Sequence, residues 1–295
     1  MGFTVGIAGL GLIGGSAAKA LHAYGDCRIF GMDISTKTLD EALHDGVLTG
    51  ELTQETISLC DWIFVALYPV DTVKWVENHA QYISRNTVLI DLCGVKRNVC
   101  AGIAPLAKAH GFTYIGGHPM AGVARFGYLN ADKDLFRGAS MLLTPEEAPS
   151  EALKTRLVDL FRTMGFGFLK WTQPDEHDRM IAYTSQLAHV LSSAYAQSPS
   201  SARHIGFSAG SLRDMTRVAM LKVDMWAELF LENREYLAEE VDALCARLDN
   251  YARALRENDR NAVSALLQCG CDAKRHMEEE EAHYAEGSHP DIQVL

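Results

Sequence analysis

The fold of this chain is decided by one stretch near its N-terminus, VGIAGLGLIG at residues 5–14. Its first half has the apolar composition of a buried strand, and helical periodicity follows Gly14. Between them stands the pattern GxGxxG. In this strand–turn–helix context Gly9 permits the tight turn, Gly11 lets the backbone approach a pyrophosphate, and Gly14 lets the helix pack closely on the strand. Without the context, the pattern would predict no more than a turn.

The glycine pattern predicts a dinucleotide site. The pyrophosphate would lie at the helix N-terminus, against the backbone of Leu12 and Ile13, where free amide N–H groups face an anion. Asp33 stands at the end of the expected second strand, where its carboxylate can accept hydrogen bonds from the adenosine ribose. An NADP enzyme commonly has an arginine just after this position, whereas this chain has Ile34 and Ser35. The sequence therefore favours NAD as the cofactor over NADP.

Short apolar runs alternate with helical periodicity over the first 170 or so residues, which is typical of βαβ units and a parallel sheet. We expect strands at Thr4–Ala8, Arg28–Met32, Trp62–Ala66, Thr87–Ile90, Thr113–Ile115, Ser140–Leu143 and Gly167–Lys170. Helices are expected between them, including Ile13–Ala23, Val70–Tyr82 and Ser150–Met164. The third strand runs into Leu67 and Pro69, which would pass beneath the bound dinucleotide at the carboxyl edge of the sheet. Packing alone could also explain that turn.

After Pro174 the strand-like runs end, and three long helical stretches follow at 175–197, 218–257 and 259–284. The fold class predicted is α/β. An N-terminal Rossmann-type, doubly wound parallel sheet in residues 1–172 precedes an all-α dimerisation domain in 173–285 and a tail in 286–295. The acidic segment from Glu278 to Leu295 is expected to be solvated or disordered.

The middle stretch, 218–257, has an apolar stripe of seven residues at helical spacing: Ala227, Phe230, Leu237, Val241, Leu244, Leu248 and Tyr251. At 1.5 Å per residue, such a helix would be about 60 Å long, too long for a small domain to cover. We therefore expect a homodimer formed through the helical domain.

Composition excludes several classes of function. The net charge of −11 and the pI of 5.4 argue against binding of nucleic acid, which requires a surplus of Lys and Arg. No apolar run is long enough to span a membrane, and the chain enters a strand at Phe3 without a basic leader, so we expect a cytoplasmic protein. The seven cysteines are scattered and are read as reduced thiols. Cys269, Cys271 and His276 lack the paired spacing of a zinc site, so no metal is expected.

His118 is the candidate catalytic residue. It lies in GGHPMAG, residues 116–122, directly after an expected strand, and ligands of open α/β sheets bind at that carboxyl edge. A neutral imidazole with a pKa near 6.5 can accept a hydroxyl proton while hydride leaves. The alternative is that a histidine between glycines and a proline is only a loop residue.

Several motifs follow one another in an order that resembles the prephenate and arogenate dehydrogenases of tyrosine biosynthesis along nearly the whole chain. They are GLGLIGGS at 9–16, DLCGVK at 91–96, GGHPMAG at 116–122, LFRGA at 135–139, TRVA at 216–219 and MW at 225–226. The resemblance implies an NAD-dependent oxidative decarboxylation of prephenate to 4-hydroxyphenylpyruvate. Hydride leaves the ring carbon that bears the hydroxyl, and the ring becomes aromatic as CO₂ departs.

The resemblance also assigns residues. It makes His118 the base, Arg217 the arginine that binds a substrate carboxylate, and Trp226 and His189 further substrate neighbours. It places Gly94 beside the substrate and Cys93 beside the cofactor, and it gives His177 and Asp178 a structural role. Taken alone, Arg217 would form a surface salt bridge with Asp214 or Glu228, Trp226 would belong to a helix core, and small residues beside His189 would admit a close helix neighbour.

Three positions depart from the family pattern: Gly94 stands where the family commonly has a serine, Gln186 replaces a histidine, and Ala124 falls in a segment that lacks the usual Glu and Ser. Arg125 is either a second carboxylate contact or a surface cation. Prephenate and arogenate both remain open as substrates. Two other classes stay as alternatives: a hydroxyacid-type dehydrogenase or reductase, for which Lys222 lacks a partner four residues on, and an NAD(H)-binding regulatory module without turnover.

Overall fold

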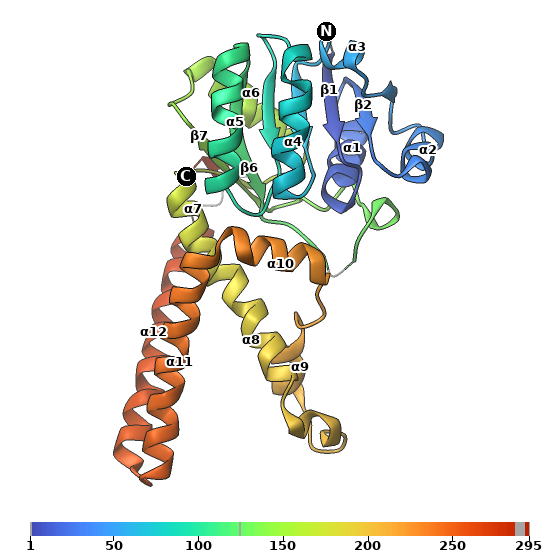
Figure 1. Cartoon of the computed structure of the whole chain (residues 1–295). Helices are drawn as coiled ribbons and strands as arrows, with labels where there is room; N and C mark the ends of the chain where they lie inside the picture. The colour runs from blue at the N-terminus through green and yellow to red at the C-terminus, as the bar shows by residue number, and fades with distance from the viewer. Residues whose placement is uncertain (1, 124, 287–292, 295) are drawn as a thin grey trace.

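One mixed sheet organises the upper half of the molecule in the computed structural model, which describes residues 2–123, 125–286 and 293–294 (Figure 1). Within those residues the sheet has nine strands in the order β3-β2-β1-β4-β5-β6-β7-β8-β9. They are β1 (Phe3–Ala8), β2 (Cys27–Met32), β3 (Gly50–Glu51), β4 (Trp62–Val65), β5 (Val88–Asp91), β6 (Thr113–Pro119), β7 (Ser140–Pro145), β8 (Phe168–Trp171) and β9 (Gln293–Val294). The strand order reverses between β1 and β4, and the crevice at such a reversal is where open α/β sheets bind ligands.

Helices cover both faces of the sheet, which explains why its strands read as continuous apolar runs. They are α1 (Leu12–Tyr24), α2 (Thr36–His44), α3 (Gln54–Ile57), α4 (Pro69–His79), α5 (Arg97–His110) and α6 (Glu151–Thr163), with short 3₁₀ turns η1 (Ala80–Tyr82) and η2 (Tyr128–Asn130). The core has two layers. Leu21 of α1 and Phe161 of α6 are buried on one face, and Trp75 of α4 and Ile103 of α5 are buried on the other. The predicted α/β, Rossmann-type class is confirmed.

One pair of strands departs from the predicted all-parallel arrangement. β7 runs antiparallel to β6, with His118 opposite Leu142 and Pro119 opposite Met141. The connection from β6 to β7 contains only the short turn η2, not a crossover helix, so the chain re-enters the sheet at the edge where it left. Sequence periodicity gave no sign of this reversal.

The lower half of the molecule is helical. Its elements are α7 (Pro174–Ile181), a π-helical turn η3 (Ala182–Gln186), α8 (Leu187–Ala196), η4 (Pro199–Arg203), α9 (Gly210–Thr216), α10 (Val223–Glu232), α11 (Arg234–Arg256) and α12 (Arg260–Glu286). Two limbs leave the sheet, one formed by α8 and α9 and the other by α11 and α12 (Figure 1). Most of the large apolar side chains that are exposed in the single chain lie in this half.

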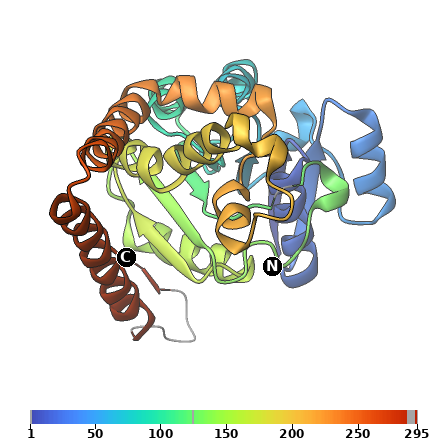
Figure 2. The ribbon, with the colours of Figure 1, turned by 90° about the horizontal axis from the view of Figure 1, so that it is seen from below.

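The single helix predicted at 218–257 is wrong. Asn233, at φ −118° and ψ 24°, separates α10 from α11, and α10 turns to run across the lower edge of the sheet (Figures 1 and 2). The break is stabilised by the buried Asn233 amide, which donates to the Asp178 carbonyl and to Gln186 Oε1, both at 2.8 Å. An asparagine inside a periodic stretch gives little warning of such a bend, and the bend brings α10 to the crevice.

The tail expectation is partly corrected. Helix α12 continues to Glu286, and Gln293–Val294 pair in parallel with β8 as the last strand, so these two residues belong to the sheet. Residues 287–292 and Leu295, which the prediction also covered, lie outside the described part of the chain. Among the helices that are described, none has the length and apolarity needed to cross a membrane.

Candidate active site

The three glycines of the first loop differ in what surrounds them. Gly9 has φ +90°, and a Cβ there would lie 2.6 Å from the Ala66 carbonyl oxygen, so both backbone angle and space require glycine. A Cβ on Gly14 would lie 1.9 Å from the Gly9 carbonyl oxygen, whereas one on Gly11 meets nothing within 4 Å. Gly11 is also the N-cap of α1, so open space borders the positive end of a helix, beside Leu12 and Ile13. This arrangement fits a dinucleotide pyrophosphate.

Asp33 joins the glycine loop to the start of α2. Its two carboxylate oxygens accept from the backbone N–H of Leu10 at 2.8 Å and of Ser35 at 2.9 Å. Each oxygen keeps a free lone pair for a ribose hydroxyl. The neighbouring Ile34 side chain is fully exposed, and Lys37 pairs with Glu41 on α2 at 3.9 Å. Among these residues there is no arginine that could bind a 2′-phosphate.

The other predicted cofactor residues divide into two groups. Leu67 packs against Gly9, and Pro69 is the buried first residue of α4, so both form the floor beside the glycine loop. Cys93 is different: its thiol is buried, lies 3.2 Å from Thr72 Oγ1, and has a pKa raised by burial. The thiol also lies 3.6 Å from the Leu67 carbonyl oxygen, so its side chain is engaged within the protein, and a contact of Cys93 with the cofactor stays a prediction.

His118 lies at the end of β6 and touches a second histidine. Its Nδ1 is 2.9 Å from His177 Nε2, and His177 Nδ1 is 2.7 Å from Asp178 Oδ1. The two imidazole rings are tilted by 57° at a centroid distance of 5.1 Å. His177 and Asp178 come from α7, so the helical half supplies the second and third members of this row of side chains. The sequence suggested only a structural role for that pair.

The hydrogen-bond partners define which ring nitrogens carry protons. Asp178 accepts from the backbone N–H of Lys96 at 2.7 Å and of Arg97 at 2.9 Å, so its carboxylate meets donors on both oxygens. His177 Nδ1 must therefore donate to Asp178, which leaves His177 Nε2 as an acceptor in the neutral ring. His118 Nδ1 then donates to it. The lone pair of a neutral His118 is left on Nε2.

Charges beneath the histidines are buried and paired. Lys96 is completely buried and forms a short ion pair with Asp91, whose other oxygen accepts from Tyr114 Oη at 2.8 Å. Burial lowers the pKa of His118 well below its usual value, and His177 and Lys96 lower it further. The pKa of His177 is also lowered by burial, although Asp178 opposes that effect. Both rings are therefore neutral at physiological pH.

Gly94 borders the free nitrogen of His118. A Cβ built on it would lie 3.9 Å from His118 Nε2 and 3.4 Å from Leu229 Cδ2, which are ordinary contact distances. Leu229 belongs to α10, so this helix, Gly94 and His118 meet at one point. The departure from serine at position 94 leaves room directly beside the proposed base.

The three predicted substrate residues of the helical half lie together. The His189 and Trp226 rings are 3.9 Å apart between centroids, and His189 Nδ1 is 3.1 Å from the Val218 carbonyl oxygen. Burial lowers the pKa of His189, and the nearby charge of Arg217 contributes. Arg217 is exposed, and within the described residues it has no salt bridge with Asp214 or Glu228. Its guanidinium is therefore available to a ligand.

Gln186, the second departure, has a packing role. Its side-chain nitrogen donates to the Leu229 carbonyl at 3.0 Å, and its oxygen accepts from Asn233. The buried amide thus fixes the end of α10 against α7 and η3. Ala124, the third departure, lies outside the described residues.

Contacts of α10 with the sheet edge were not predicted. Glu228 accepts from the Val70 N–H at the start of α4 at 3.1 Å, and Lys222 lies 5.2 Å from the Tyr68 ring centroid and 5.9 Å from that of Phe126. The ammonium of Lys222 rests on aromatic faces, not on an acid/base partner. A hydroxyacid-type catalytic lysine is therefore not supported.

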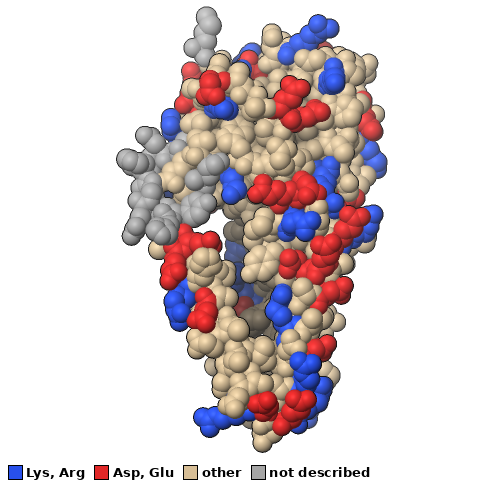
Figure 3. Space-filling model, turned by 90° about the vertical axis from the view of Figure 1, so that its left-hand side faces the viewer, with Lys and Arg blue, Asp and Glu red and all other residues tan. Residues whose placement is uncertain are grey.

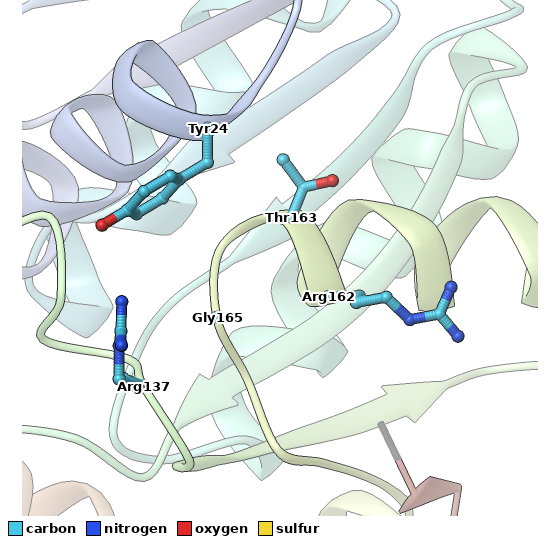
Figure 4. Close-up of a pocket in the computed structure, with 5 residues that line it drawn as sticks. All are labelled: Tyr24, Arg137, Arg162, Thr163 and Gly165. Carbon is cyan, nitrogen blue, oxygen red and sulfur yellow. The ribbon is translucent and has the colours of Figure 1, made fainter. Parts of the chain in front are cut away.

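A hollow of about 440 Å³ elsewhere on the molecule is lined by Tyr24, Arg137, Arg162, Thr163 and Gly165 (Figure 4). None of these belongs to the candidate site. Arg137 and the Tyr24 hydroxyl both bind Asp134, and Arg162 pairs with Asp159, so the polar groups that line the hollow have partners within the protein.

In the part of the chain that is described, no cluster of three His, Cys, Asp or Glu side chains could hold a metal. The seven cysteines are free thiols.

Comparisons with known proteins match both halves of the chain. The model of the prephenate dehydrogenase nucleotide-binding domain matches residues 17–166, and that of the prephenate dehydrogenase dimerization domain matches residues 173–269. A cyclohexadienyl dehydrogenase of Zymomonas mobilis is 29% identical over 86% of this chain and 89% of its own length. A prephenate dehydrogenase of Bacillus subtilis is 26% identical over 87% of this chain and 71% of its own length.

Solved structures share the fold. A prephenate dehydrogenase from A. aeolicus, in complex with hydroxyphenyl propionate and NAD⁺, superposes with a TM-score of 0.79 at 22% identity, over 92% of this chain and 98% of that one. An arogenate dehydrogenase from Synechocystis gives 0.76 at 23% identity, over 92% and 99%.

Proposed function

Since the chain belongs to the prephenate dehydrogenase family, and is thus a dehydrogenase of aromatic amino-acid biosynthesis, we propose that it converts prephenate to 4-hydroxyphenylpyruvate by NAD-dependent oxidative decarboxylation. The observation that carries the proposal is His118. Its hydrogen bond to His177 leaves Nε2 unprotonated, and this nitrogen lies 3.9 Å from the position of a Cβ on Gly94, at the carboxyl edge of the sheet. A base with that tautomer at that edge is what removal of a hydroxyl proton requires.

In this proposal His118 Nε2 takes the proton from the ring hydroxyl. NAD⁺, held by the glycine loop and Asp33, would supply the hydride acceptor. Formation of the aromatic ring would drive the loss of CO₂, so the second step needs no metal. Leu229 and the rest of α10 cover the sheet edge and exclude water from the reacting carbon. The low pKa of His118 keeps the base unprotonated below neutral pH.

Arg217, His189 and Trp226 would bind the substrate. Prephenate is a dicarboxylate, and the planar fork of an arginine can hold a carboxylate through two donors. Arg217 carries no salt bridge in the described residues, and the His189 ring contacts the Trp226 ring beside it at an interplanar angle of 48°. Lys222 adds a second cation on the same stretch, at the Tyr68 and Phe126 rings.

Arogenate, which differs by an ammonium in place of the side-chain keto group, is the alternative substrate. An ammonium would need a carboxylate partner, and Glu228 of α10 already accepts from the Val70 N–H through Oε1. The exposed cations Arg217 and Lys222 favour the keto acid. A steady-state absorbance assay of NADH formation with prephenate and with arogenate, each with NAD⁺ and NADP⁺, decides between them.

We also propose that NAD is preferred over NADP, because Asp33 faces the ribose position and Ile34 offers no cation. The Ile34→Arg variant is expected to raise kcat/KM with NADP⁺ about tenfold, since a charge-assisted hydrogen bond to the 2′-phosphate contributes roughly 1.5–3 kcal/mol. Activity with NAD⁺ should hardly change, because the side chain is fully exposed. Ile34→Gln is the matched control, and an equal rise in that variant would refute the assignment.

A second prediction concerns the missing serine. Gly94 has a backbone angle that other residues adopt and room for a Cβ, so both Gly94→Ser and Gly94→Ala should fold normally. The serine hydroxyl would stand beside His118 Nε2, where it can hydrogen-bond the substrate hydroxyl and align it with the base, which should raise kcat/KM for prephenate about fivefold over the alanine control, equivalent to one hydrogen bond of about 1 kcal/mol. Thermal unfolding and steady-state kinetics measure the two effects. Lower activity in the serine variant than in the alanine variant would contradict this geometry.

For the organisation of the chain, we propose a cofactor domain in residues 1–172 and a substrate and dimerisation domain in 173–285, with the homodimer formed through the latter. The family models, which divide between residues 166 and 173, support the boundary. Exposed apolar side chains on the helical limbs, such as Ile205, Phe207 and Leu255, support the interface. The face seen in Figure 3 intersperses Lys and Arg with Asp and Glu instead of presenting a basic field, as expected for a protein that acts on a small molecule.

A further inference from the structure

The row His118–His177–Asp178 ends in a carboxylate that is held unusually firmly. Asp178 is buried, and its two oxygens accept from consecutive backbone N–H groups, those of Lys96 and Arg97, at the N-terminus of α5. The Arg97 Nε lies 3.7 Å from Oδ2. Backbone donors and the helix dipole both stabilise the charged carboxylate. The Asp178 carboxylate is thus a fixed anion beside His177, and the two histidine rings separate it from the reacting atoms.

The heavy-atom positions suit two arrangements of protons. In the first, His118 Nδ1–H donates to His177 Nε2, and His118 Nε2 is free. In the second, His118 carries its proton on Nε2, and a doubly protonated His177 donates from Nε2 to His118 Nδ1 and from Nδ1 to Asp178. The 2.9 Å contact between the two rings and the 2.7 Å contact between His177 and Asp178 are good hydrogen bonds in both arrangements. Donor and acceptor exchange places only in the contact between the rings. No side chain has to move between them.

The surrounding charges favour a positive charge on His177 over one on His118. His118 faces the ammonium of Lys96 and the His177 ring, and no carboxylate among the described residues touches it. His177 faces Lys96 as well, but it is in direct contact with Asp178 and lies within the field of Asp91. A proton that reaches this pair is therefore stabilised on the inner ring, where an anion receives it.

We propose that His177 is the final acceptor of the proton that His118 removes, and that Asp178 is the counter-ion of the resulting imidazolium. The substrate hydroxyl gives its proton to His118 Nε2 while His118 Nδ1 passes its own proton to His177 Nε2, so one proton enters the pair and His118 stays neutral. When the product has left, the transfers reverse and Nε2 releases the proton to water. The identity of the hydroxyl rests on the proposed function, but the proton placement does not. His177 and Asp178 act through His118 and are positioning residues.

Proton placement is measured without turnover, in the whole protein labelled with ¹⁵N-histidine. Two-bond ¹H–¹⁵N correlation spectra across a pH titration report which nitrogens of each ring are protonated, and spectra of His118→Asn and His177→Gln assign the two rings among the eleven histidines. At high pH both rings should be Nδ1–H tautomers. On acidification the first proton taken up by the pair should make His177 an imidazolium while His118 stays neutral with its proton on Nε2. Protonation of His118 first, or an Nε2–H tautomer of His118 at high pH, would overturn the proposal.

The His177→Gln variant adds a kinetic readout. Its amide oxygen can still accept from His118 Nδ1, so the tautomer of His118 is retained, but it cannot take up a proton. We expect a loss of kcat and an acidic limb of kcat/KM that moves to lower pH, because the only remaining base faces Lys96 without a carboxylate. An unchanged limb would contradict the relay. If prephenate is not turned over while the spectra are as expected, the proposed function fails and the proton relay stands.

Discussion

The His118→Asn variant is expected to lose about 10²–10⁴-fold in kcat with prephenate, the usual contribution of a positioned general base. Asparagine can still donate to His177 Nε2 through its amide, so the packing around Asp178 survives, but it offers no lone pair of suitable basicity to the substrate hydroxyl. KM should change little because the carboxylate contacts lie elsewhere. Steady-state kinetics measure the effect, and binding of NAD⁺ by fluorescence quenching checks that the cofactor site is intact.

His110→Asn is the matched control for this variant. His110 is exposed at the far end of α5, the helix whose other end holds Asp178. Its replacement should leave kcat and KM unchanged. A His118→Asn enzyme with more than a tenth of the original kcat would mean that another group removes the proton, and the assignment of the base would be wrong.

The Arg217→Gln variant is expected to raise KM for prephenate about 10–100-fold with a smaller change in kcat. A charge-assisted hydrogen bond contributes roughly 1.5–3 kcal/mol, and each 1.4 kcal/mol is a factor of ten. The loss appears mainly in KM because the carboxylate does not change charge during hydride transfer, so ground state and transition state are bound alike. The exposed, unpaired position of Arg217 beside His189 is the basis of the prediction.

Arg213→Gln is the control, since Arg213 is also exposed and lies one turn earlier on α9. If the loss of positive charge from this limb were enough to raise KM, KM would rise in both variants, and the rise would become smaller at high salt. If Arg213→Gln matches Arg217→Gln, the carboxylate clamp is not Arg217. Equal thermal unfolding temperatures would show that neither variant acts through stability.

Local signals in the sequence were enough to predict the strand–glycine-loop–helix unit and the place of Asp33 beside it. Gly9, Gly14 and Asp33 are dictated by contacts within a single strand–turn–helix–strand unit, so their spacing alone carries the information. The position of His118 followed from the same logic, because a residue after a parallel strand lies at the carboxyl edge. The resemblance to a family supplied Arg217 and Trp226, which no local pattern distinguishes from surface and core residues.

What the sequence left out are contacts between distant segments. The bond between His118 and His177 joins residues 59 positions apart, and neither neighbourhood shows that the rings meet. The break at Asn233 depends on two acceptors supplied by α7 and η3, so a continuous apolar stripe concealed it. The burial of the Cys93 thiol against Thr72 is another such contact, since the two residues lie 21 positions apart.

The most direct test of the central claim is the stoichiometry of one reaction: purified protein with limiting prephenate and excess NAD⁺, with NADH followed by absorbance, CO₂ by manometry or a coupled assay, and 4-hydroxyphenylpyruvate by chromatography. We expect equal amounts of the three products, and with His118→Asn at most about a hundredth of each over the same initial period. Absence of NADH with prephenate while NAD⁺ binds, or NADH without CO₂, would contradict the proposed reaction and point to a different hydroxyl substrate in the space beside Gly94 and His118.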